Sequence, residues 1–174
     1  MKAYSVAGKF ASIAFATLIL AACSGTKTSS DADADAAAAA ASDAAAAEQA
    51  AASAAAEQRQ KEAAAEAVGN VFYFEFDSSA LTDEARASVD AHVAAMLGNN
   101  HSIRLEGHTD ERGTREYNLA LGERRANAVR DYMVANGVPS YRIESVSYGE
   151  EDPAALGSGE SSWKQNRRVV LKHR

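Results

Sequence analysis

The stretch GHTDERGTREYNLALGERRANAVRDYMVANG, residues 107–137, predicts a polar loop followed by a long helix. Apolar side chains recur at helical spacing over residues 116–136. Gly137 predicts the end of this helix, and Pro139 prevents its continuation. The apolar face of the helix must be covered by a sheet, and the flanking segments contain the strands.

The segments around this helix alternate between strand and helix patterns. Thr82, followed by two acidic residues, predicts the start of a second helix that ends near residues 98–100. Residues 161–166 predict a single helical turn. The predicted strands are residues 71–76, with Phe72, Phe74 and Phe76 on one face, and residues 102–106, 143–148 and 167–172. This order, β-α-β-α-β-β, predicts an α+β domain in which two helices cover a mixed sheet, largely on one face.

Arg125 is the anomaly of the long helix. At 100° per residue it lies on the same face as Val129 and Met133, whereas Arg124 points towards solvent. Arginine is rarely buried without a partner, because removing its charge from water is costly. The partner is either an internal carboxylate, such as Asp77 or Asp110, or the carboxylate of a ligand in a cleft. The sequence leaves both alternatives open.

Two carboxylates follow predicted strands and could lie near Arg125. Asp77 follows the first strand and Asp110 follows the second. Parallel strands separated by a helix bring such ends together, and the crevice beyond strand ends is a common ligand position. An arginine beside carboxylates suits a zwitterion, because the guanidinium binds a carboxylate and aspartate accepts from an ammonium group.

The amino-terminal residues resemble a bacterial lipoprotein signal peptide. Lys2 and Lys9 precede an apolar run that is too short to span a membrane. The following LAAC motif, residues 20–23, resembles a lipobox, in which Cys23 becomes the lipidated amino terminus. We expect a diacylglycerol thioether and an N-linked acyl chain, which together give stable membrane attachment. The alternative is an ordinary signal peptide with a chance cysteine. Ser24 after the cysteine favours the outer membrane.

Residues 23–68 predict a linker of low complexity. Much of the 47% hydrophobic fraction is alanine in this region, which offers little surface to bury. Alanine favours helix, so we expect a solvated, partly helical spacer; a disordered tail is the alternative. The net charge of −6 gives no support for nucleic-acid binding. The predicted organisation is a signal peptide at 1–22, the lipidated linker at 23–68 and one folded domain at 69–174.

Five blocks of sequence, in order, closely resemble the OmpA-like carboxyl-terminal domain family and, within it, the peptidoglycan-associated lipoprotein (Pal) family. The blocks are GHTDERGT at 107–114, YN at 117–118, LGERRANAV at 121–129, SYGE at 147–150 and NRRV at 166–169. The resemblance covers roughly residues 70–172, and the lipobox favours the lipoprotein branch. The alanine-aspartate spacer departs from the family pattern.

The resemblance implies non-covalent binding of peptidoglycan through the diaminopimelate of its stem peptides, without catalysis or a cofactor. It implies that Asp110 and Arg125 grip this group, with Phe76, Asp77, Thr114, Asn118 and Leu119 around them. It also implies a Tol–Pal system at the outer membrane, which supports envelope integrity and constriction at division, with the domain in the periplasm. TolB is the implied protein partner; Tyr148 and Glu150 are candidate contacts.

Two other classes of function fit the residues less well. A periplasmic cell-wall hydrolase could use His108, Asp110 and Ser78 as a triad, but no Gly-x-Ser-x-Gly motif is present. A metal site could use the four histidines, but these are dispersed and lack paired-ligand spacing. We therefore predict a binding protein with no catalytic residues and no metal.

Overall fold

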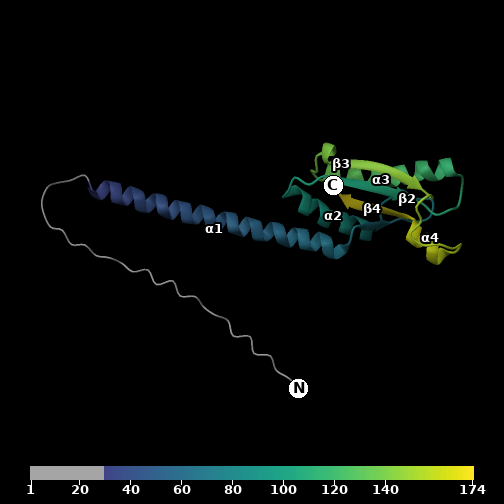
Figure 1. Cartoon of the computed structure of the whole chain (residues 1–174), viewed down its shortest axis with the longest axis horizontal. Helices are drawn as coiled ribbons and strands as arrows, with labels where there is room; N and C mark the ends of the chain where they lie inside the picture. The colour runs from purple at the N-terminus through teal and green to yellow at the C-terminus, as the bar shows by residue number, and fades with distance from the viewer. Residues whose placement is uncertain (1–29) are drawn as a thin grey trace, which may run out of the picture. The chain divides into compact units, whose positions relative to one another are not determined.

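The computed structural model describes residues 30–174 (Figure 1). Its elements in chain order are α1 (Ser30–Val68), β1 (Val71–Tyr73), α2 (Asp83–Leu97), β2 (Ile103–His108), α3 (Arg115–Ala135), the 3-10 helix η1 (Ser140–Arg142), β3 (Ile143–Gly149), α4 (Glu160–Asn166) and β4 (Arg168–His173). This order confirms the predicted α+β class. The predicted signal peptide and Cys23 lie outside the described residues.

The four strands form one mixed sheet in the order β1-β4-β2-β3 (Figure 1). β2 and β3 are parallel, and β4 is antiparallel to both β1 and β2. β1 and β2 therefore run in the same direction, as expected, but β4 lies between them. The residues that precede β4 consequently lie between the ends of β1 and β2, where the ligand site was predicted.

One face of the sheet packs against α2 and α3, which confirms the predicted layering. Side chains that point to this face are buried, among them Leu105 on β2 and Leu171 on β4. They meet Val89 on α2 and Val129 on α3 in a single core. On the other face, charged pairs such as Arg104 and Glu144 alternate with these apolar positions. The apolar alternation of the strands thus fixes which face carries the helices.

The first strand is shorter than predicted, and the expected position of Phe76 is wrong. β1 ends at Tyr73, and only the amide of Phe74 continues the pairing, by donating to the carbonyl of Arg167 at 2.9 Å. The chain then turns, and Asp77 adopts a positive φ of 54°. Phe72 and Phe74 are buried, whereas the turn leaves Phe76 57% exposed.

The described part of the linker, residues 30–68, is a single helix, α1, which favours the helical alternative over the disordered one for these residues. Residues 45–174 form one compact unit, so the last turns of α1 belong to it. Gln58 donates to the carbonyl of Ala95 at 2.8 Å, and Asn99 donates to Glu62 at 3.1 Å. This part of the linker therefore contacts α2 and is not simply a solvated spacer.

No helix between residues 30 and 174 has the length and apolar character needed to cross a membrane.

Two caps fix the ends of α2 and α3 nearest the site. Thr82 has an extended backbone, and its side chain accepts a hydrogen bond from the amide of Ala85, which confirms the predicted helix start. Thr114 caps α3 in the same way through the amide of Tyr117. At the other end of α3, Gly137 adopts a positive φ of 100°. The start of α3 is thereby held just beyond the end of β2.

Close backbone packing sets the depth at which α3 lies on the sheet. A Cβ atom added to Gly107 on β2 would lie 2.0 Å from the carbonyl oxygen of Gly122 on α3. One added to Gly122 would lie 2.3 Å from Oγ of Ser147 on β3. Both glycines are therefore needed for the close approach of α3 to the parallel pair.

We predict that Gly107→Ala lowers the free energy of unfolding by about 1–3 kcal/mol, because the added methyl group forces α3 away from β2. Urea unfolding followed by circular dichroism measures the loss. Gly159→Ala is the matched control, because no atom lies within 4 Å of the added Cβ. Equal stabilities of the two variants would contradict the packing argument.

Candidate ligand-binding site

Arg125 is fully buried, as its position on α3 predicts. Its guanidinium group donates three hydrogen bonds to main-chain carbonyls: Nε to Ser78 at 2.8 Å, and the two terminal nitrogens to His108 at 3.0 Å and to Glu75 at 3.0 Å. No carboxylate of the described residues lies within ion-pairing distance of it. The internal-carboxylate alternative is therefore wrong, because main-chain oxygens take the place of Asp77 and Asp110.

These carbonyls satisfy Arg125 without neutralising its charge. Burial lowers the pKa of Arg125 to about 10, although the nearby carboxylate of Asp110 favours the charged form. The group remains cationic at neutral pH. Three of its five N–H donors are used, so two remain for another acceptor. An anion beside Arg125 would still be stabilised.

A cavity of about 220 Å³ opens beside Arg125. Its walls come from the ends of β1 and β2, the start of α3 and the residue before β4. The lining residues are Phe76, Asp77, Thr109, Asp110, Arg112, Gly113, Tyr117, Asn118, Leu121, Arg125 and Arg167. Three guanidinium groups and two carboxylates therefore face one small volume.

Asp110 is 4% exposed and is bound on both carboxylate oxygens. Oδ1 accepts from the amide and Nε of Arg112, and Oδ2 accepts from Arg112 at 2.6 Å and from Arg167 at 3.4 Å. Burial by itself would raise the pKa of Asp110, but the hydrogen bonds and charge of Arg112, with Arg167, hold it below its ordinary value. Asp110 is thus an anion at neutral pH.

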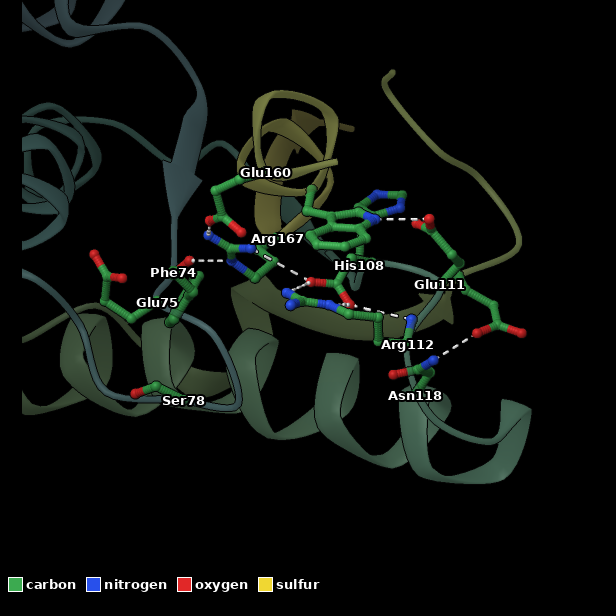
Figure 2. A network of polar contacts seen from close by, with 12 residues as sticks. Phe74, Glu75, Ser78, His108, Glu111, Arg112, Asn118, Glu160 and Arg167 are labelled. Atoms are coloured by element: carbon green, nitrogen blue, oxygen red, sulfur yellow. Dashed lines mark hydrogen bonds and ion pairs between the residues drawn. The ribbon is translucent and has the colours of Figure 1, made fainter. Parts of the chain in front are cut away.

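Arg112 lies between two aromatic rings. Its guanidinium carbon is 4.0 Å from the centre of the Phe76 ring and 4.0 Å from that of Trp163. The indole of Trp163 is held by Glu111, which accepts its N–H at 2.6 Å. Figure 2 shows Arg112 among the hydrogen-bonded side chains of the site, with Arg167 nearby. The exposed position of Phe76 is thereby explained, because its ring packs on a cation and not in the core.

Arg167 enters the site through its position before β4. It is 2% exposed and donates to the carbonyl of Phe74 at 3.1 Å and to Glu160 at 2.6 Å (Figure 2). It also donates to Asp110. It thus connects the end of β1 to the loop after β2.

The other residues predicted for the site divide into two groups. Asp77 and Asn118 line the cavity, and their side chains bond to Tyr117 and Glu150 respectively. Thr114 and Leu119 do not line it. Thr114 instead caps α3, and the carbonyl of Leu119 accepts from Ser147.

Sequence reasoning did not identify Arg112, Tyr117 and Arg167 as site residues. Arg112 and Arg167 lie inside the quoted blocks GHTDERGT and NRRV, but nothing in the spacing of Arg112 distinguishes it from a surface arginine. The sequence does predict an inward-pointing side chain for Arg167, because this residue continues the alternation of apolar positions in the strand that follows it.

His108 is buried against Tyr148, whose ring stacks on it at 5.6 Å. Neither of its ring nitrogens has a hydrogen-bond partner. The hydroxyl of Ser78 accepts from the amide of Ala80, and Asp110 is bound by arginines. The proposed triad of His108, Asp110 and Ser78 is therefore not assembled in this structure.

Between residues 30 and 174 no group of three or more His, Cys, Asp or Glu side chains could hold a metal ion. The site is a small cavity at the ends of strands that run in the same direction. Arg112 and Arg167 are ion-paired there, whereas Arg125 has no carboxylate partner among the described residues. A cavity with this lining is a candidate site for a small charged ligand.

Residues 73–167 match the OmpA family, and the chain belongs to this family. It is 58% identical over 101 residues to the peptidoglycan-associated lipoprotein of Pseudomonas aeruginosa, covering 58% of this chain and 60% of that protein. It is 49% identical over 104 residues to the protein of the same name from Rhizobium meliloti, covering 59% of each chain. The match thus spans about three-fifths of these curated relatives.

The solved structures agree with this assignment. The crystal structure of the peptidoglycan-associated lipoprotein from Burkholderia pseudomallei superposes with a TM-score of 0.59 at 44% identity, over 60% of this chain and 90% of that chain. The carboxyl-terminal domain of Helicobacter pylori MotB, 21% identical with a TM-score of 0.56 over 60% of this chain and 84% of that chain, shows the same fold. The lipoproteins' names describe an association and not a reaction, in agreement with a non-enzymatic protein.

We predict that His108 makes the stability of the domain depend on pH. Burial, followed by the charge of Arg168, lowers the pKa of His108 to about 4. An unfolded histidine titrates near 6.5, so between pH 6.5 and 4 the unfolded state binds a proton that the folded state rejects. The free energy of unfolding should therefore fall by on the order of 3 kcal/mol as pH decreases through this window.

His108→Phe keeps the ring stack but cannot titrate. Urea unfolding at pH 7, 5.5 and 4 should show a flatter pH dependence for this variant than for the original chain. His101→Phe, at an exposed position, is the matched control. An unchanged slope in the His108 variant would show that other groups cause the acid sensitivity.

Proposed function

We propose that this chain is an outer-membrane lipoprotein that binds peptidoglycan non-covalently through diaminopimelate and tethers the outer membrane to the cell wall. The observation that carries the proposal is the buried cation of Arg125, which has no carboxylate partner of its own and borders a cavity that also contains Asp110. In this proposal the domain acts within a Tol–Pal system that supports envelope integrity and constriction at division.

The chemistry of the cavity suits the end of the diaminopimelate side chain. That group carries a carboxylate and an ammonium on one carbon, so a receptor needs a cation and an anion close together. Arg125 has two unused N–H donors for the carboxylate, and Asp110 is an acceptor for the ammonium. A ligand that lacks either charge would leave a buried group unpaired, which disfavours lysine-containing stem peptides.

The surrounding residues have supporting parts in this proposal. Phe76, Asp77 and Asn118 border the bound group directly, because they line the cavity. Thr114 and Leu119 act from behind this wall, by capping α3 and anchoring it to β3.

The relatives support the same proposal. Those compared are named peptidoglycan-associated lipoproteins, and the match to the OmpA family, over residues 73–167, includes all the lining residues. A periplasmic cell-wall hydrolase is not favoured, because His108 and Ser78 are not arranged for catalysis. Incubation with purified wall separates the two functions: a binder sediments with the wall, whereas a hydrolase releases soluble muropeptides.

We predict that Asp110→Asn abolishes co-sedimentation with wall that contains diaminopimelate, because it removes the charge while preserving the side-chain shape. Glu123→Gln, at an exposed position on α3, is the matched control and should retain binding. The original chain should bind wall that contains lysine at this position much more weakly. Equal binding of both walls would contradict recognition of the zwitterion.

Arg125 needs a different design. Arg125→Ala would leave three buried carbonyls without donors, so a loss of binding could reflect unfolding. Arg125→Lys keeps the positive charge but lacks the several N–H donors of the guanidinium group, so it should weaken binding. Arg124→Ala, which alters an exposed neighbour, should have much less effect.

We also propose the division of the chain into a signal peptide at 1–22, a lipidated linker at 23–68 and the peptidoglycan-binding domain at 69–174. We predict that Cys23→Ala remains an unlipidated precursor, because the thiol that forms the thioether is absent. Labelled palmitate incorporation and membrane fractionation measure this. Normal acylation and outer-membrane fractionation of the variant would contradict the proposed anchor.

TolB is the proposed protein partner, with the domain exposed to the periplasm. Tyr148 and Glu150 are the proposed contacts, and Glu150 is linked to the cavity through Asn118. This proximity favours competition between TolB and the wall for one surface.

A further inference from the structure

Asp110 has no vacant acceptor for the ammonium group that the proposed function assigns to it. A carboxylate offers about four acceptor positions. In this structure the amide of Arg112, two of its guanidinium nitrogens and one nitrogen of Arg167 occupy four. A ligand can therefore reach Asp110 only if one of these donors leaves.

The side chain of Arg112 is the donor that can leave. Arg167 is 2% exposed and is held by two further acceptors, whereas the Arg112 side chain is 31% exposed and bonds only to Asp110. Arg112 also lies in the short loop between β2 and α3, next to Gly113. Rotation of its side chain breaks the hydrogen bonds to Asp110 and the two ring contacts, but no hydrogen bond between helices or strands.

We propose that Arg112 is an internal competitor, a cation of the chain itself that occupies the ammonium position until the ligand displaces it. This inference rests on the proposed function, because it concerns the same Asp110. The guanidinium group has the features expected of a bound cation: a carboxylate at 2.6 Å and aromatic rings on two sides at 4.0 Å. An ammonium group suits the same three contacts.

The charge balance of the cavity supports the exchange. With Arg112 inside, three cations face two anions. With Arg112 outside, Arg125 and Arg167 face Asp77 and Asp110, which is the balance that a zwitterion requires. The buried carboxylate of Asp110 is also never left unpaired, because one cation replaces another. A ligand must therefore compete with Arg112 for Asp110, and this competition favours ligands with a localised positive charge.

Removal of the competitor should strengthen binding. We predict that Arg112→Ala binds the soluble stem tripeptide ending in meso-diaminopimelate about tenfold more tightly than the original chain, because the ligand no longer displaces an ion pair and two ring contacts. The affinity of Arg112→Lys should lie between those of the original chain and Arg112→Ala, since lysine keeps the charge but cannot form the paired guanidinium hydrogen bonds to Asp110. Calorimetry on the full chain in detergent measures affinity, and Trp163, the only tryptophan, gives an independent fluorescence signal.

Arg115→Ala is the matched control. Arg115 is an exposed arginine paired with Glu151 outside the cavity, so its removal should leave the affinity unchanged. Asp110→Asn combined with Arg112→Ala should lose binding, which would show that the gain acts through Asp110.

The possible results separate the two proposals. If the original chain binds the tripeptide and Arg112→Ala binds equally or more weakly, the competitor is overturned while the proposed function stands. If neither the original chain nor any Arg112 variant binds the tripeptide, the proposed function fails, and the competitor fails with it.

Discussion

The structure depends on one buried cation. The guanidinium group of Arg125 extends from α3 and bonds to three carbonyls, two in the segment after β1 and one at the end of β2. Its desolvation is costly, and these bonds offset the cost while holding both strand ends against the helix. Because carbonyls carry only partial charge, the cation is satisfied but not neutralised. The same interaction therefore fixes the local fold and leaves a preference for an anion beside it.

The order of the strands in the sheet places the other residues of the site next to Arg125. β4 lies between β1 and β2, so Arg167 and Asp110 meet in the gap between the two strand ends. The glycine contact between β2 and α3 brings the start of α3 close enough to close the third side. Every wall of the cavity is thus attached to a different element of secondary structure. The loop between β2 and α3 and the turn after β1 supply the remaining lining residues, so a ligand held there contacts loops that these elements anchor.

Several polar groups that line the cavity are paired within the domain. Arg112 neutralises Asp110, Tyr117 bonds to Asp77, and Asn118 bonds to Glu150. Such internal pairing leaves fewer buried charges without a partner, and it makes ligand binding an exchange of partners in the proposed function. The affinity for a charged ligand then depends on the difference in free energy between the contacts within the domain and the similar contacts that the ligand makes. In the proposed exchange, selectivity arises because few small molecules present both an ammonium group to Asp110 and an anion to Arg125.

The sequence by itself determined the extents of α2 and α3, the cap at Thr82, the strands after residues 102 and 142, and the inward position of Arg125. Each depends on local periodicity or on a hydrogen bond within one turn, and these are written in neighbouring residues. Only the tertiary structure decided that β4 separates β1 from β2, that Phe76 leaves the core, and that the last turns of α1 contact α2. It also chose main-chain carbonyls as the partners of Arg125 and arginines as the partners of Asp110. These outcomes depend on segments far apart in the chain, and a carbonyl acceptor has no signature in the sequence because every residue carries one.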